Sequence, residues 1–400
     1  MKIIKPDYYD AFTCSASECS YTCCQEWTIA VDDAHKESWK SLKIPETVQG
    51  IAGFSGRTHL SDLVKKVPEG YAIDMGKTKV CPFLNDRKLC EIVLAYGEEC
   101  ISCTCHTFPR KCQSYTTRLE YALDLGCPEA LDLLWKKGRF ALKEEVMEDL
   151  SALTGTEKEL MEAATETGEE DSRLFLIRKK AMELIAREDI PLTTGWIMLF
   201  GLMLDFYEKG EQLKENYIEE MFSEKVISQL KATVLHAGRD LIDHFTERNE
   251  LFLDVCENYR KKKLYESVLS EVTDRADWFE LTDDDYTSKM YREFEGIWES
   301  LESRIRLVML EGLYSGMLLP GGDLYSMVLK TQWLGLTLTM IRHALFLRYE
   351  LDEEYIEEKA KALVVVILRM TGYSEADIEE YLEHAFEEII WSWGYMALIV

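Results

Sequence analysis

The hydrophobic pattern of the chain changes near residue 173. From there to the end, apolar residues recur at intervals of three and four, which is the spacing of one face of an α-helix. Alternating runs of β-branched residues are few in the same part. We therefore predict an all-helical domain over residues 173–400. Its predicted helices cover residues 174–187, 194–208, 213–227, 236–263, 289–314, 323–349, 353–370 and 374–390.

Local end signals support the last two of these helices. Gly372 can close the first of them, because glycine readily adopts the left-handed conformation at helix C-termini. Ser374 and Asp377 have the spacing of a capping pair at the start of the second. A Pro-Gly-Gly run at residues 320–322 predicts a turn between two helices and nothing more.

Helical periodicity is weaker in the first 145 residues. Residues 45–80 contain many glycines and prolines, which indicates loops and turns. The pattern still predicts a few short elements with recognisable starts and stops. They are a strand over residues 27–31, a helix from Asp33 to about Leu42, a hairpin near residues 71–75, a short helix through Leu89 and Tyr96 that stops at Gly97, and a helix that begins at Pro128.

An acidic segment separates the two patterns. Residues 151–172 are poor in bulky apolar side chains and contain Gly155 and Gly168. This composition is typical of a linker. We therefore divide the chain into an N-terminal domain over residues 1–145, a linker over residues 146–172 and the helical domain over residues 173–400.

Cysteine is concentrated in the N-terminal domain. Of the 12 cysteines, all but Cys256 lie between Cys14 and Cys127. Thiolates are soft ligands that select zinc, copper(I) or iron–sulfur clusters. The first residues show no secretory signal, so we expect a cytoplasmic chain with reduced thiols. Adjacent cysteines such as Cys23 and Cys24 also suit a disulfide framework poorly, and we predict a metal centre instead.

The cysteine spacing narrows the kind of metal centre. A zinc ribbon needs two C-x-x-C pairs, and the chain has one, Cys100 with Cys103. Cys19 and Cys23 fit the C-x3-C-x2-C spacing of a radical cluster, but the next cysteine is Cys24 and comes too early for the third position. A four-thiolate cluster with widely separated ligands meets no such objection, so we expect [4Fe–4S], with zinc as the alternative. We expect His106 to be an ordinary loop histidine.

The fold class that follows is mainly α, with a small irregular cysteine-rich metal-binding domain ahead of an all-helical domain. The net charge of −27 repels a phosphate backbone and argues against nucleic-acid binding. An acidic surface could attract a lysine-bearing partner, although solubility is the simpler explanation of the charge. The most apolar window, residues 333–347, is interrupted by Arg342 and His343, and no membrane span is expected.

Common catalytic motifs are missing from the sequence. We find no G-x-S-x-G, no Walker A loop, no H-E-x-x-H and no G-x-G-x-x-G after a strand. The simplest interpretation of the acidic trio Asp283, Asp284 and Asp285 is a solvated helix start. The residue pattern therefore assigns no catalytic or cofactor-binding side chain. The helical histidines are expected to be structural; they are His236, His244, His343 and His384.

Four motifs in the N-terminal domain carry a resemblance to a known family. They are CSASECSYTCCQEW at residues 14–27, CPFLNDRKLCEI at 81–92, TCHTFPR at 104–110 and GCPEAL at 126–131. In this order and at these distances they resemble the flagellin lysine-N-methylase family. The same cysteine block is similar to the wider family of small cysteine-rich zinc- or iron-chelating proteins. A late stretch, YSEADIEEYLEH at residues 373–384, is similar to the C-terminal region of the methylase family.

The resemblance implies a cytoplasmic bacterial enzyme linked to motility, which transfers methyl groups from S-adenosylmethionine to lysine side chains of flagellin with the help of a metal centre. It also implies the metal-ligating set, and it leaves Cys100, Cys103 and Cys112 additional to the family pattern. The implied ligands are Cys14, Cys19, Cys23, Cys24, Cys81, Cys90, Cys105 and Cys127.

Two other classes of function remain open from the sequence. The chain could be a non-catalytic metal-binding adaptor whose helical domain docks a partner, or a redox or metal-storage protein that uses its surplus thiols. Methyl transfer to an amine needs positioning and a neutral nucleophile rather than a metal, so a cluster would be structural or orienting. We expect the methyl-donor pocket between the cysteine-rich domain and the helices.

Overall fold

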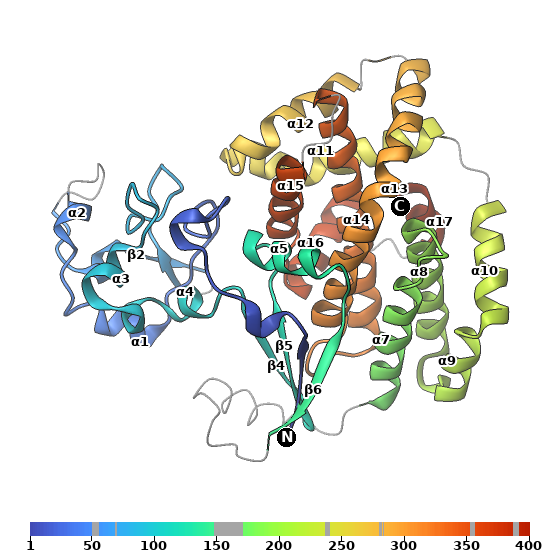
Figure 1. Cartoon of the computed structure of the whole chain (residues 1–400), viewed down its shortest axis with the longest axis horizontal. Coiled ribbons are helices and arrows are strands. Elements are labelled where there is room, and N and C mark those ends of the chain that lie inside the picture. Colours follow the sequence, from blue (N-terminus) through green and yellow to red (C-terminus); the bar gives the residue numbers. More distant parts are fainter. Residues whose placement is uncertain are drawn as a thin grey trace.

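The structure is a computed structural model of the chain, and it describes residues 1–49, 56–68, 70–147, 171–236, 241–279, 282, 284–352, 357–386 and 392–400. It is mainly helical, as the periodicity predicts (Figure 1). Residues 148–170, which make up nearly all of the predicted linker, lie outside the described residues.

Five short helices belong to the first 147 residues, and the longer ones follow residue 171. The early helices are α1 (Asp33–Ser38), α2 (Glu46–Gln49), α3 (Glu91–Tyr96), α4 (Cys103–Thr107) and α5 (Pro128–Lys137). The later helices are α7 (Ser172–Ile185), α8 (Leu192–Lys209), α9 (Glu215–Met221), α10 (Glu224–His236), α11 (Leu241–Lys262), α12 (Glu266–Phe279), α13 (Asp284–Gly316), α14 (Leu324–Asp352), α15 (Glu357–Met370), α16 (Glu375–Phe386) and α17 (Trp393–Ile399).

The N-terminal part also forms two small sheets. One has the strand order β4-β5-β1-β6, with β1 parallel to β5 and antiparallel to β6. Ile3 pairs with Leu119 on one side and with Glu145 on the other. The other sheet is the β2–β3 hairpin. The strands are β1 (Lys2–Pro6), β2 (Val64–Val67), β3 (Gly70–Ile73), β4 (Arg110–Ser114), β5 (Arg118–Leu123) and β6 (Leu142–Val146).

The hydrophobic core consists of one large cluster, one small cluster and a group of three residues, Ile4, Ala122 and Tyr314. The large cluster joins the helices to N-terminal residues such as Phe12, Leu123 and Leu131. The small one is built around Trp39 and Phe83 inside the cysteine lobe, which we define as residues 14–109 without residues 50–55 and 69. Figure 1 shows this lobe on one side of the molecule and α7 to α10 on the other, with α5 and the four-stranded sheet between them.

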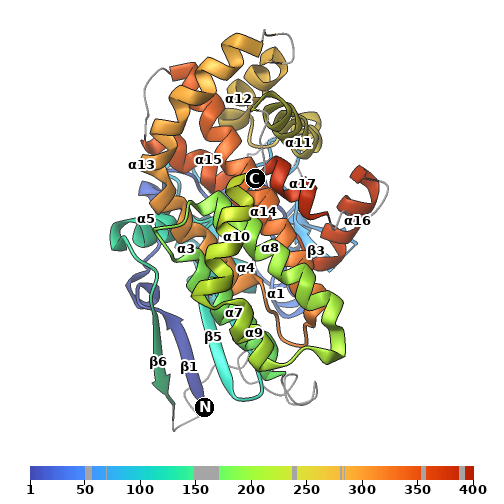
Figure 2. The same ribbon diagram turned by 90° about the vertical axis from the view of Figure 1, so that its right-hand side faces the viewer.

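Helix α14 is the central element of the helical part. It is 29 residues long and packs against α8, α11, α13 and α15, so most of its surface is buried (Figure 2). Gly335 permits the closest approach, because a Cβ atom at this position would lie 2.6 Å from Nε1 of Trp196 on α8. No helix in the described part of the chain is both long and apolar enough to cross a membrane.

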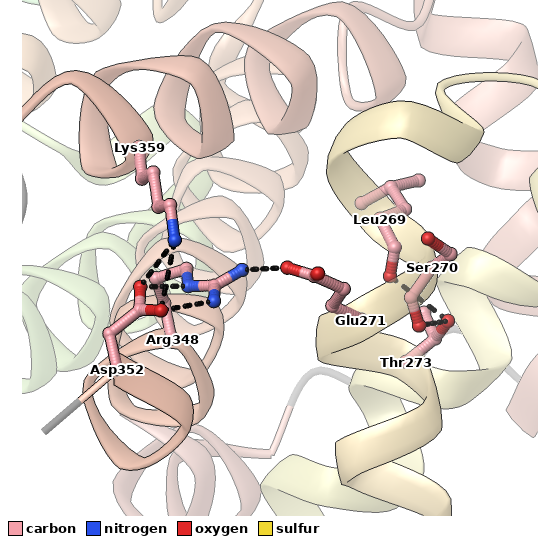
Figure 3. Close-up of polar contacts among 7 residues, drawn as sticks. All are labelled: Leu269, Ser270, Glu271, Thr273, Arg348, Asp352 and Lys359. Carbon is pink, nitrogen blue, oxygen red and sulfur yellow. Dashed lines mark hydrogen bonds and ion pairs between the residues drawn. The ribbon is translucent and has the colours of Figure 1, made fainter.

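A polar network ties the end of α14 to its neighbours (Figure 3). Arg348 donates from Nε and Nη2 to the Asp352 carboxylate at 2.6 and 2.7 Å, and from Nη1 to Glu271 of α12 at 2.5 Å. Lys359 of α15 donates to the same Asp352 carboxylate at 2.9 Å. The bidentate pair lies within α14 and is largely buried, and its more exposed partners Glu271 and Lys359 connect it to α12 and α15.

Several predicted boundaries are confirmed. Gly97 ends α3 with a φ of +92°, and Pro128 is the first residue of α5. The capping pair of α16 forms as predicted, since Oγ of Ser374 accepts from the Asp377 amide at 3.2 Å and the Asp377 carboxylate accepts from the Ser374 amide at 3.2 Å. Ile389 and Ile390 of this predicted helix lie outside the described residues.

Other predictions are wrong in detail. Residues 27–31 form no strand; only Ala30 makes an isolated bridge, to Ala72. The helix predicted to Leu42 ends at Ser38, and Asp32 rather than Asp33 caps it. The helix predicted over residues 213–227 is split into α9 and α10. The sequence also gave no prediction of α12, α17 or the four-stranded sheet.

Candidate functional site

The eight cysteines implied as ligands lie at turns and helix starts. Cys90 and Cys127 are the N-cap residues of α3 and α5, and Cys105 lies inside the short helix α4. Cys81 and Cys127 are buried, whereas Cys14 and Cys105 are exposed as whole residues. All twelve cysteines of the chain lie in the described residues, and no disulfide joins any of them. The remaining ligand candidates, Cys19, Cys23 and Cys24, lie in the turns between residues 19 and 24.

Within the lobe, five of these cysteines interact with one another, and we call them the lobe thiols: Cys23, Cys24, Cys81, Cys90 and Cys105. Backbone contacts bring their segments together. The Cys81 amide donates to the Cys24 carbonyl at 2.8 Å, and Cys90 forms a bridge with Leu84 three residues after Cys81. Trp27 also packs against Phe108, with the rings tilted by 52° and their centroids 5.1 Å apart, which brings the Cys105 segment toward Cys24.

The lobe thiols interact electrostatically. Burial raises the pKa of Cys81 well above its usual value, and the neighbouring Cys24, Cys105 and Cys90 raise it further. Although Cys105 is exposed as a whole residue, desolvation of its thiol raises the pKa of Cys105 to about 11, with added contributions from Cys24 and Cys90. The hydrogen bond with Cys23 lowers the pKa of Cys24, which makes Cys24 the first thiol of the group to ionise. Mutual repulsion of this kind is relieved when a cation binds between the thiolates.

Three further cysteines form a second group, the junction thiols Cys14, Cys19 and Cys127. Burial raises the pKa of Cys127 to about 11, and Cys19 and Cys14 contribute to the rise. Backbone amides of Ala130 and Glu129 at the start of α5 act in the opposite direction. The family-like cysteines are therefore divided between the interior of the lobe and its boundary with α5.

Arg369 of α15 holds this boundary together. Its guanidinium donates to the carbonyls of Gly126 at 2.8 Å, Thr22 at 3.1 Å and Tyr21 at 3.1 Å. Gly126 directly precedes Cys127, and Thr22 directly precedes Cys23, so one cation from the helical part aligns two cysteine segments. Its charge also lowers the pKa of Cys24. A second link is the Tyr265 amide, which donates to Oε1 of Glu26 at 2.9 Å.

The lobe thiols have the donor chemistry that a soft metal prefers, but their side chains are not arranged around a common point. Within the described residues, no three His, Cys, Asp or Glu side chains are close enough together to hold a metal ion. Cys24, Cys81, Cys90 and Cys105 are linked by their effects on one another's pKa, and all four offer the thiolate donors that zinc and iron–sulfur centres use.

The additional cysteines occupy different surroundings. Cys103 begins α4, and its amide donates to Asp32 at 3.0 Å. Cys100 packs at the edge of the lobe core, and Cys112 lies in strand β4. Cys256 is buried in α11, within the large core cluster, where desolvation raises its pKa to about 12.

A buried carboxyl group that the sequence did not single out lies between the sheet and α13. Glu311 is 2 % exposed and accepts a hydrogen bond from Tyr8 Oη at 2.7 Å. Burial raises the pKa of Glu311 to about 7, against the lowering effects of Tyr8 and Lys111. The sequence feature that could have identified this buried group is a carboxylate within the otherwise apolar residues 307–313.

His343 is structural, as the sequence predicts for the histidines on helices. His343 is 1 % exposed, its Nε2 lies 2.9 Å from Oδ1 of Asn249, and Phe245 and Phe252 pack beside it. Burial lowers the pKa of His343 to about 3, so the ring is neutral at physiological pH.

Comparison with curated proteins confirms the resemblance seen in the cysteine motifs. The lysine-N-methylases of Salmonella typhimurium and Salmonella choleraesuis are each 25% identical over 183 residues, which is 46% of this chain and 40% of those proteins. The flagellar biosynthetic protein FliU of Salmonella muenchen is 29% identical over 133 residues, 32% of this chain and 73% of its own length. The chain thus matches less than half the length of the lysine-N-methylases. No protein-family description matches the chain, and no solved structure matches it.

Proposed function

We propose that this chain is a protein lysine N-methyltransferase that uses S-adenosylmethionine and acts on flagellin or another lysine-bearing protein. The observation that carries the proposal is the similarity to proteins named lysine-N-methylase, together with the four ordered cysteine motifs. The name of FliU supports a flagellar setting. We place the reaction in the bacterial cytoplasm, where flagellin is made and thiols are kept reduced.

The proposed chemistry is a direct displacement. The lone pair of a neutral lysine amine attacks the methyl carbon of the sulfonium, the carbon–sulfur bond breaks, and its electron pair stays on sulfur as the neutral thioether. The new ammonium then releases its proton to solvent or to a carboxylate. The chain has to hold the two reactants in line and exclude water, and its net charge of −27 favours encounter with a cationic lysine-rich segment.

We further propose that Cys24, Cys81, Cys90 and Cys105 hold an iron–sulfur cluster, with zinc as the alternative, and that the junction thiols and Cys23 surround it. The proposal draws on the convergence of these segments and on their donor chemistry. A bound centre would supply the cross-link that keeps the turns of the lobe in place. The displacement itself needs no electron from it.

The enzymatic proposal is tested with purified chain, labelled S-adenosylmethionine and flagellin. We expect label on lysine residues, located by peptide mass spectrometry, and none when the flagellin lysines have been acetylated beforehand. Donor binding measured by calorimetry accompanies the assay. A chain that contains metal but neither binds the donor nor labels lysine is instead a metal-binding adaptor.

The metal proposal predicts a contrast between ligand and non-ligand substitutions in the same lobe. Cys81→Ser, and equally Cys90→Ser, should remove most of the bound metal and destabilise the lobe, because thiolate coordination and folding are coupled. Cys103→Ser is the matched control and should keep the metal, since Cys103 is not a predicted ligand. The measurements are iron, sulfide and zinc content of anaerobically purified protein, with thermal unfolding. Equal metal content in all three proteins contradicts the assignment.

A further inference from the structure

A cavity on the helical side of the molecule has no role in the description so far. It lies among the start of α7, the end of α8 and the turn that joins α13 to α14, and it has a volume of about 550 Å³. We call it the aromatic cavity. Ligand pockets for drug-sized molecules cover this range of volume, roughly 300–1,000 Å³. A lysine side chain alone would fill only a small part of it.

Four aromatic rings line the aromatic cavity in two pairs. The ring centroids of Tyr115 and Phe175 are 5.2 Å apart, and those of Tyr207 and Tyr325 are 6.3 Å apart. Hydrogen bonds hold one ring of each pair, since Tyr115 Oη donates to the Leu318 carbonyl at 2.7 Å and Tyr325 Oη donates to Glu379 at 2.8 Å. The Arg118 guanidinium already lies 3.6 Å from the centroid of Phe175, and the Arg178 guanidinium lies 5.9 Å from that of Tyr115. A ligand would therefore contact the Tyr207–Tyr325 pair, because aromatic rings can stack on a heteroaromatic base and attract a cation to their faces.

The charged groups of the aromatic cavity leave it negative. The guanidinium of Arg173 is bound to the Asp171 carboxylate at 2.6 Å and to the Leu213 carbonyl at 2.9 Å, so this pair is neutral as a unit. Glu211 and Asp323 also line the cavity and add two negative charges. Carboxylates in this position repel phosphates, which excludes a nucleotide, and accept hydrogen bonds from hydroxyl groups.

These features match one class of ligand better than others. A nucleoside sulfonium presents a base for stacking, a ribose diol that can donate to carboxylates, and a positive charge for the acidic and aromatic walls. We propose that the aromatic cavity binds the nucleoside sulfonium methyl donor, an inference that rests on the proposed methyltransferase function. It gives a position for the donor that differs from the expected one between the cysteine-rich domain and the helices.

The position of the cavity also separates the donor from the lobe thiols. Tyr115 follows the last residue of β4, and this strand starts at Arg110, at the edge of the lobe. Five residues of strand span about 17 Å. Figure 1 shows α7 and α8 on the side of the molecule away from α1 to α4. A donor in the aromatic cavity would react without contact with a centre held by the lobe thiols.

Two substitutions in the whole chain test the proposal. Tyr207 is 41 % exposed and Glu211 is exposed, so Tyr207→Ala and Glu211→Gln should leave the fold intact, which circular dichroism and thermal unfolding verify. Each should weaken S-adenosylmethionine binding in calorimetry by about fivefold or more, the size of one lost cation–π or charge contact. Glu211→Gln should weaken the binding of S-adenosylhomocysteine less than the binding of S-adenosylmethionine. Only S-adenosylmethionine carries the positive charge on sulfur that the Glu211 carboxylate would attract.

Matched controls lie elsewhere on the helical surface. Tyr286→Ala removes a similarly exposed tyrosine at 37 %, and Glu219→Gln removes an exposed carboxylate of α9; both should bind the donor like the unchanged chain. If the chain binds S-adenosylmethionine and the cavity variants bind it equally well, the cavity assignment is wrong while the proposed function stands. If only binding of a methylated lysine peptide is weakened, the cavity belongs to the substrate, and the assignment is again wrong. If the unchanged chain does not bind the donor at all, both proposals fail.

Discussion

At the scale of single residues, burial decides the chemistry of ionisable groups. His343 and Glu311 are both almost fully buried, and in each case the neutral form is favoured. Burial lowers the pKa of a histidine in the folded state below its pKa in the unfolded state. For a glutamic acid, burial raises the pKa in the folded state above that in the unfolded state. The two residues therefore change the free energy of unfolding in opposite directions as the pH is lowered.

The His343 effect predicts a loss of stability in mild acid. Below pH 6.5 the unfolded state binds a proton at this histidine, whereas the folded state does so only near pH 3. Stability must then fall as the pH falls, by about 2 kcal/mol between pH 7 and pH 5 for this residue. Urea unfolding of the unchanged chain and of His343→Gln at both pH values measures the effect. The stability advantage of histidine over glutamine should shrink by that amount, and a constant difference would show that His343 titrates normally.

Glu311 acts in the opposite sense. Its folded pKa of about 7 lies above its usual value of 4.5, so its contribution to stability is fully present below pH 4.5 and is lost as the pH rises through 7. The comparison of the unchanged chain with the His343 variant cancels this contribution, since both proteins keep Glu311.

At the scale of elements, helix contacts depend on how closely the backbones approach. α8 and α14 cross where Gly335 faces Trp196, and Met396 of α17 lies at the same crossing. A side chain on Gly335 would overlap with two large buried groups that have little room to move. The helical core thus requires a glycine here for packing, although the residue lies in the middle of a helix.

Two glycine substitutions should therefore have opposite effects. Gly335→Ala places a Cβ atom 2.6 Å from Trp196 Nε1 and 2.8 Å from Met396 Sδ, and should cost about 3 kcal/mol in the free energy of unfolding through overpacking. Gly296→Ala on α13 meets nothing within 4 Å and should stabilise by about 0.5–1 kcal/mol, because alanine favours the helix. Chemical unfolding of both variants checks the prediction. Stabilisation by both would show that the α8–α14 contact is looser than described.

At the scale of the whole molecule, the lobe and the helical part depend on each other. The large core cluster contains residues from both, and Arg369 and Tyr265 bind backbone or side-chain oxygens of the lobe. The net charge of −27 is spread over this assembly. A lysine-rich substrate would be attracted over distances comparable with the Debye length, about 10 Å at 0.1 M salt.

This charge predicts a salt dependence of the proposed reaction. The kcat/KM for flagellin should fall by about tenfold between 0.05 and 0.5 M NaCl, because screening removes the electrostatic attraction. Lysine peptides with arginine flanks should lose more activity than peptides with glutamate flanks. Steady-state kinetics at several salt concentrations provide the measurement. An equal response of both peptides would show that the acidic surface serves solubility alone.

The sequence by itself determined what depends on neighbouring residues. The helical domain follows from apolar spacing of three and four, and the ends at Gly97, Pro128 and Ser374 follow from local backbone preferences. The cysteine motifs and the similarity to lysine-N-methylases were likewise readable from the chain.

Only the tertiary structure decided which distant segments meet. Strand β6 is exposed along its whole length and carries no alternating pattern, so its pairing with β1 had no local signal. The division of the cysteines into lobe and junction thiols depends on Arg369, nearly 350 residues from Tyr21. The aromatic cavity joins residues from Tyr115 to Tyr325. Contacts of this kind are set by the packing of whole elements, because the side chains that form them have no fixed relation along the sequence.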